Sequence, residues 1–279
     1  MQFDPDQPKP DRPRQDNHPD APAQSWRWSD DLLMGLRFYS RLPTGDRPFE
    51  KPDLTRIALG LPFTSLVIGI GPALLLLLGA LVGLPGLMAA TLAVGAMIAV
   101  TGAMGEDALG DTADGLIGGS TIERRLEIMK DSRHGTYGVS AMVLFIALRI
   151  TALGSLAAIN PLAAAGVWLA VEILGRSGAL WLTVDLHPAR EGGASASVGR
   201  LRRRGFFIGA GFAALLAFVF AAPFTSLLGV VLAVFVAAGV ALGWSQICRR
   251  LIGGQTGDLI GALGALIEIA SLTVLMIFA

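Results

Sequence analysis

Residues 225–244 read TSLLGVVLAVFVAAGVALGW, contain no charged side chain, and decide the fold class. A helix needs about 20 mostly apolar residues to cross the hydrocarbon core of a bilayer, which is roughly 30 Å thick. The sequence therefore predicts an all-α, polytopic transmembrane helix bundle of about seven spans in the lipid bilayer. The other apolar segments of comparable length are 58–82, 86–104, 138–158, 161–182, 206–222 and 259–278.

The composition of the whole chain agrees with a membrane protein. Of its 279 residues, 53% are hydrophobic and only 16% are charged, and the mean hydropathy is +0.59. Soluble domains carry about 25% charged residues. The 22 basic residues balance 22 acidic ones, so no nucleic-acid partner is expected. The single cysteine, Cys248, excludes an intramolecular disulfide.

The N-terminal segment differs in composition from everything that follows it. Residues 1–28 are rich in proline and poor in apolar side chains, which predicts a disordered cytoplasmic tail. Residues 29–279 are then the integral membrane domain. The stretch 30–42 mixes Arg37 and Arg41 with leucine and aromatic residues and is too short to span. It suits either a helix in the membrane interface or a short helix packed under the loops.

The distribution of basic residues predicts the orientation of the bundle. Twenty of the 22 lysines and arginines lie before the first span or in the connections 105–137, 183–205 and 245–258. The short turns between the other spans carry none. Because basic residues favour the cytoplasmic side, the N-terminus and the three long connections are expected there. With seven spans, the C-terminus lies outside, and one helix more or fewer would reverse its side.

The densest polar feature is the stretch 105–115, GEDALGDTADG. If it is helical, Asp107, Asp111 and Asp114 lie within an arc of about 60° on one face, and Glu106 points in another direction. Three carboxylates at the end of a membrane helix repel one another unless a cation lies between them. Mg²⁺, which prefers oxygen ligands and often bridges to substrate phosphates, is the natural partner. The alternative is a solvated acidic loop.

A basic cluster follows in the stretch 123–138. Its cations could bind a polyphosphate, although a salt-bridged amphipathic helix is at least as good an interpretation for Arg124 taken singly. Asp131, next to a Gly-Thr-Tyr-Gly turn, is expected to approach the metal as a fourth carboxylate. An acidic cluster followed by a basic one predicts a site for metal plus phosphate. The basic candidates are Arg124, Arg125, Lys130 and Arg133.

Ionisable residues inside the apolar spans are functional candidates because their burial in a bilayer is costly. Glu172 and Arg176 are four residues apart and could equally form a structural pair within the bundle. Asp258 begins the last span, and a helix cap and a site residue are equally good interpretations of it. For the basic run 200–204 topology is a sufficient explanation, and phosphate binding is the less favoured alternative. The candidates within the spans are Arg149, Glu172, Arg176 and Glu268.

Several motifs of the sequence resemble those of a known family. The motifs DTADGL, ERRLEIMKDSR and GTYG between Asp107 and Gly138 resemble the signature of the cobalamin synthase family, the adenosylcobinamide-GDP ribazoletransferases. The FYSRLP element that contains Arg41 and the RLIGGQTGD element that runs from Arg250 to Asp258 are also similar to family motifs. The resemblance covers roughly residues 30–278. It places Arg41, Arg250 and Asp258 among the substrate-binding candidates.

Four positions depart from the family pattern, among them Ala108 in place of a glycine and Gly110 in place of an alanine. Gly105 stands where relatives usually have a histidine, which removes any role of that side chain. His134 stands where an aliphatic residue is usual, and no catalytic role is expected for it. The three aspartates of the pattern are retained.

The resemblance implies an enzyme of the last stage of cobalamin assembly. Such enzymes join α-ribazole or its 5′-phosphate to adenosylcobinamide-GDP, release GMP, require Mg²⁺ and lie in the bacterial cytoplasmic (inner) membrane with the active site toward the cytoplasm. A homo-oligomer or contact with other cobalamin-assembly enzymes is left open. A CDP-alcohol phosphatidyltransferase is disfavoured because residues 114–119 lack its arginine and its second aspartate pair. A transporter is disfavoured because no inverted repeat is evident.

Overall fold

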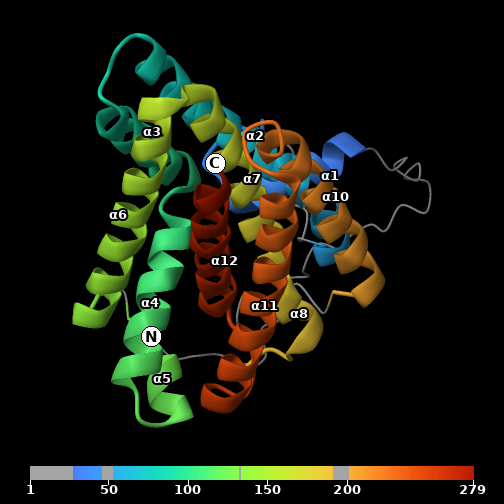
Figure 1. The fold of residues 1–279 in the computed structure, drawn as a ribbon. Helices are drawn as coiled ribbons and strands as arrows, with labels where there is room; N and C mark the ends of the chain where they lie inside the picture. Colours follow the sequence, from blue (N-terminus) through green and yellow to red (C-terminus); the bar gives the residue numbers. More distant parts are fainter. Residues whose placement is uncertain (1–27, 46–52, 132, 191–200) are drawn as a thin grey trace, which may run out of the picture.

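The computed structural model describes residues 28–45, 53–131, 133–190 and 201–279 (Figure 1). The tail expected over residues 1–28 therefore lies outside the described residues, except for Trp28. The described part is helical, and its only β feature is an isolated bridge between Pro188 and Gln255. The helices are α1 (Trp28–Tyr39), α2 (Leu54–Leu81), α3 (Gly86–Thr101), α4 (Met104–Gly118), α5 (Ile122–Ile128), α6 (Thr136–Ile159), α7 (Pro161–Ala179), α8 (Trp181–Asp185), α10 (Arg203–Ala221), α11 (Leu227–Leu251) and α12 (Gly257–Phe278).

The predicted fold class is confirmed. Six helical segments among the described residues are long and apolar enough to cross a membrane, and α3 with α4 makes a seventh if that bent pair counts as one span. We count the bent pair as the seventh span, with α3 as its membrane-crossing part and α4 outside the membrane, because α4 has 15 residues and four of them are acidic. The six segments are α2, α6, α7 with α8, α10, α11 and α12.

The second expected span, 86–104, ends three residues earlier than expected, at Thr101 of α3. The chain leaves α3 through Gly102 and Ala103, both in the left-handed region with φ of 66° and 59°, and α4 starts 85° off the axis of α3. Arg41 packs against the open side of Gly102, so a larger residue there would displace its side chain. The bend matters because it turns α4 back into the bundle, where it lies between α6 and α12 (Figure 1).

The connection expected over residues 105–137 is therefore mostly ordered helix, and the connection 245–258 is shorter than expected. Helix α11 continues to Leu251, so Cys248 is a buried helical residue. Helix α12 is capped by Thr256, whose hydroxyl accepts from the Leu259 amide. Asp258 is thus the second residue of α12 and not its cap.

Helix α7 forms the centre of the bundle. It contacts α2, α10 and α12 and is buried along most of its length, whereas the other spans keep broad apolar surfaces exposed. Close approach depends on small residues, as at Gly175, where an added Cβ would meet the backbone of Gly264 on α12. Helix α1 packs on α2, and its buried Asp31 pairs with Arg56. This packing is compatible with both interpretations of the segment, which stay predictions.

Candidate active site

The three aspartates of α4 follow one side of the helix, as their spacing predicted. The Asp107 side chain is 63% exposed and that of Asp111 is 15% exposed, whereas Asp114 is buried. All three contact the end of the α5–α6 connection or the first turn of α6, through His134, Gly135 and Gly138. The side chains therefore lie along a gradient from the surface into the bundle.

His134 lies between the first two aspartates. Its Nε2 is 3.4 Å from Oδ1 of Asp107, and its Nδ1 is 3.5 Å from Oδ1 of Asp111. One donor atom from each of the three residues lies within 4.8 Å of the others, a spacing that a single cation can bridge. The expectation that His134 has no role did not anticipate this placement. The available signal was its position inside the 123–138 block, beside the acidic helix.

The negative charges of Asp107 and Asp111 favour the binding of a proton or a cation between them. Burial, followed by repulsion from Asp107 and Asp258, raises the pKa of Asp111 to about 6. A carboxylate in such surroundings is stabilised by a nearby proton or cation. The Asp107, Asp111 and His134 cluster therefore has the geometry and the charge of a cation site.

Asp114 has a different environment from the other two aspartates. Its carboxylate accepts from the backbone amides of Gly135 at 2.6 Å and Gly138 at 2.9 Å. Any side chain at Gly138 would collide with this carboxylate and with the carbonyl of Gly110. Asp114 thus anchors the start of α6 and does not join the cluster of possible ligands.

Asp131 also lies apart from the cluster and pairs with Arg133. The guanidinium donates Nε to Oδ1 at 3.0 Å and Nη2 to Oδ2 at 2.6 Å, a two-point contact. These hydrogen bonds from Arg133 lower the pKa of Asp131 to about 2, so this carboxylate is ionised at neutral pH. Asp114, Arg124, Asp131 and Arg133 line one hollow of about 300 Å³.

The remaining basic candidates divide between surface and structural positions. Arg124 pairs with Glu127 at 2.7 Å on the exposed side of α5, as the salt-bridge alternative proposed. Arg125 donates to the carbonyls of Gly119 and Leu251 and joins α5 to the end of α11. Both Lys130 and Arg250 are exposed.

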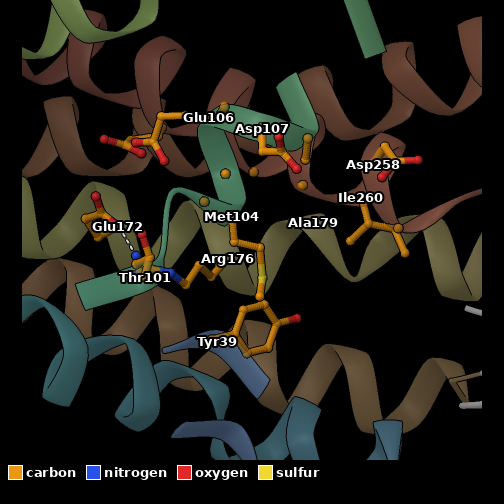
Figure 2. Close-up of a pocket in the computed structure, with 18 of the residues that line it drawn as sticks. Tyr39, Thr101, Met104, Glu106, Asp107, Glu172, Arg176, Ala179, Asp258 and Ile260 are labelled. Carbon is orange, nitrogen blue, oxygen red and sulfur yellow. Dashed lines mark ion pairs between the residues drawn. The ribbon is translucent and has the colours of Figure 1, made fainter. Parts of the chain in front are cut away.

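A cavity of about 310 Å³ opens beside the acidic face (Figure 2). Asp107 and Asp258 line it, so the cavity meets the cation cluster at Asp107. In the view of Figure 2, Glu172 and Arg176 lie at one side and Asp258 at the other. The apolar part of the wall comes mainly from Phe38, Tyr39, Met97, Met104, Phe145 and Leu180.

Buried ion pairs form the inner wall of this cavity. Arg149 contacts three carboxylates: Nη1 lies 2.8 Å from Glu106, Nη2 lies 2.6 Å from Glu172, and Nε lies 2.7 Å from Glu268. Arg176 pairs with Glu172 at 2.7 Å, which confirms the structural pairing considered for these two residues. Glu106 points away from the aspartates, as expected, but its partner was not foreseen. The four ionisable residues of the spans thus meet at one place.

Comparison with known proteins shows similarity along most of the chain. The sequence model of the cobalamin-5-phosphate synthase family matches residues 31–276. An adenosylcobinamide-GDP ribazoletransferase of Azorhizobium caulinodans is 41% identical over 253 residues, which cover 89% of this chain and 96% of the relative. Proteins of the same name from Brucella anthropi and Rhizobium meliloti are 39% and 40% identical, and the matches cover 88% and 87% of this chain and 94% of each relative. No solved structure matches the chain.

Proposed function

Since the chain belongs to the cobalamin-5-phosphate synthase family, we propose that it joins α-ribazole or its 5′-phosphate to adenosylcobinamide-GDP with release of GMP. The product is adenosylcobalamin or its 5′-phosphate. The observation that carries the proposal is the match over residues 31–276, which includes the complete acidic helix and the cavity beside it.

We propose Mg²⁺ as the cofactor, held by Asp107 and Asp111 with His134 beside them. The fit rests on two carboxylates and one imidazole whose donor atoms lie within 4.8 Å of one another. Because carboxylate oxygens suit Mn²⁺ as well as Mg²⁺, the same cluster should also bind Mn²⁺. A divalent cation held there would neutralise negative charge on the pyrophosphate of the substrate. Asp114 and Asp131 were the other two expected ligands, and in this proposal neither of them binds the cation.

The reaction replaces a phosphoanhydride bond with a phosphate ester bond. A ribose hydroxyl of the nucleoside attacks the phosphorus that carries the cobinamide, forming a new P–O bond. The P–O bond to GMP breaks, and GMP leaves with the electron pair. Asp258 lines the cavity beside Asp107 and is placed to accept the proton of the attacking hydroxyl.

The basic side chains around the α5–α6 connection would hold the leaving group. Arg124 and Arg133 line the same hollow as Asp114, and Arg133 is exposed apart from its pair with Asp131. Asp131 orients the guanidinium of Arg133 in this role and does not bind the metal. Lys130 adds positive charge nearby, whereas Arg125 holds α5 against α11. Arg41 supports the α3–α4 bend.

The proposed location is the bacterial cytoplasmic membrane, with the acidic helix open to the cytoplasm. The concentration of lysine and arginine in the long connections supports this orientation. It agrees with the chemistry, because nucleotide-linked substrates are cytosolic.

Turnover by the purified protein tests the function. The full chain in detergent is incubated with adenosylcobinamide-GDP, α-ribazole and Mg²⁺, and GMP and the corrinoid product are quantified. Equal amounts of GMP and of adenosylcobalamin are expected, with no GMP when α-ribazole is omitted. GMP release that does not depend on α-ribazole would indicate a hydrolase and would contradict the proposal.

A further inference from the structure

We propose that the 310 Å³ cavity beside Asp107 is the binding site for the aromatic base of the nucleoside substrate, so that α-ribazole enters base first. This inference rests on the proposed function and assigns one of its two substrates to one part of the molecule. The other substrate, which carries the corrin ring, then approaches from outside the cavity.

Size is the first argument. Cavities of about 300–1,000 Å³ hold drug-sized ligands, and a cavity of 310 Å³ lies at the small end of this range. A dimethylbenzimidazole riboside is of that size. A corrin ring with its axial adenosyl group is several times larger and cannot enter.

The second argument is the chemistry of the cavity wall, which suits a benzimidazole better than a guanine. The aromatic and thioether side chains of Phe38, Tyr39, Met97 and Phe145 form an apolar lining suited to a planar, methylated ring. Guanine carries a carbonyl, an amino group and a ring N–H, and each would need a partner when buried. The inner carboxylates already bind Arg149 and Arg176, which leaves Asp107, Asp258 and a few hydroxyl groups as the partners that a buried guanine could find.

A buried benzimidazole needs fewer hydrogen-bond partners than a buried guanine. Its unsubstituted nitrogen is a single hydrogen-bond acceptor, and its ring can stack on a guanidinium. Arg176 lines the cavity and keeps 15% of its side chain exposed, whereas Arg149 is almost fully buried. Arg176 is therefore the cation within the cavity that is best placed to contact the base.

The position of the cavity is the third argument. Asp107 belongs both to the cavity wall and to the cluster with Asp111 and His134. A nucleoside whose base fills the apolar part must therefore place its ribose near Asp107 and Asp258. This brings the attacking hydroxyl to the proposed cation and to the proposed proton acceptor.

Filling the cavity tests the assignment. Ala179 is a buried lining residue at the end of α7, and Ala179→Phe adds an aromatic ring to the space. The matched control is Ala147→Phe, the same change on the exposed side of α6. A second variant, Gly105→Leu, also reduces the space because Gly105 lines the cavity, and nothing lies within 4 Å of an added Cβ there that would oppose the change.

Binding of α-ribazole is measured on the full-length protein by calorimetry, and KM is measured for each substrate. Both cavity variants should weaken α-ribazole at least about tenfold while the KM for adenosylcobinamide-GDP stays within twofold, and Ala147→Phe should match the wild type. If the wild type is active and both cavity variants bind α-ribazole as tightly as the wild type does, this inference alone is overturned. Wild-type protein that neither binds α-ribazole nor releases GMP would overturn the proposed function as well.

Discussion

Nη1 of Arg149 lies 2.8 Å from Oε1 of Glu106 and joins the middle of α6 to the first turn of α4. Glu106 immediately precedes Asp107, so this contact fixes the start of the acidic helix. The same guanidinium binds Glu172 on α7 and Glu268 on α12. One buried cation thus holds three helices around the residue that opens the proposed site.

Replacing Arg149 by methionine should destabilise the protein strongly. The change leaves three buried carboxylates with only Arg176 as a cation, and breaking a buried pair costs about 3–5 kcal/mol. Thermal unfolding of the purified variant should show a Tm several degrees below that of the wild type. Replacement of the exposed Arg124 by methionine provides the control and should leave Tm unchanged. Equal Tm values for the two variants would show that the buried network contributes little.

Substitutions should distinguish Asp107 and Asp111, which bind the cation, from Asp114, which holds the start of α6. Asp107→Asn and Asp111→Asn should each weaken Mn²⁺ binding by at least about tenfold, as measured by electron paramagnetic resonance, because each removes a charged oxygen donor. His134→Ala should weaken it less. Asp114→Asn should instead lower Tm and leave Mn²⁺ affinity close to that of the wild type, because its carboxylate holds two backbone amides.

Loss of Mn²⁺ binding in Asp114→Asn, with Asp107→Asn unaffected, would reverse this division. It would move the cation site one to two turns deeper along α4. Circular dichroism of each variant controls for loss of the helix itself.

The raised pKa of Asp111 predicts how cation binding depends on pH. Because the folded-state pKa is about 6, above the ordinary value of 3.8, the contribution of this group to stability is present below about pH 4 and lost as the pH rises through 6. A bound cation should relieve that loss. The gain in Tm on adding Mg²⁺ should therefore be larger at about pH 7.5 than at about pH 5. The variant His134→Gln should keep this difference, since it removes only the imidazole. An equal gain at both pH values would contradict the role of Asp111.

Cysteine labelling tests the orientation of the bundle in intact cells. Native Cys248 is buried and should remain unlabelled, so it need not be removed. Ser120→Cys, in the exposed α4–α5 turn, should be protected from a membrane-impermeant thiol reagent, whereas Val82→Cys should react. Val82 is preferred over Gly83, whose φ of 95° strains any other residue. Labelling of Ser120→Cys from outside would overturn the cytoplasmic placement.

The sequence was sufficient to predict the bundle because spanning helices are specified by local composition. Residues 225–244 needed no information from the rest of the chain. The bend between α3 and α4 was not predictable in the same way. Gly102 and Ala103 both adopt the left-handed conformation, and alanine does so only where the surrounding structure imposes it.

The site was predictable where its residues share one helix. The spacing of Asp107 and Asp111 placed them on one side of α4, and this pair lies together in the structure. The contacts of Arg149 involve Glu106 and Glu268, which are far from it in sequence, so periodicity carries no signal for them. His134 belongs to the same class, because only the return of the chain after α5 brings it to α4.

The central claim is that the carboxylates of α4 carry out ribazole transfer, and GMP release by the Asp107→Asn variant tests it most directly. Wild-type and variant protein are purified alike and supplied with adenosylcobinamide-GDP, α-ribazole and Mg²⁺. The wild type should release one GMP for each cobalamin formed, and the variant should be slower by about a hundredfold or more. A variant that is folded and turns over at the wild-type rate would contradict the account.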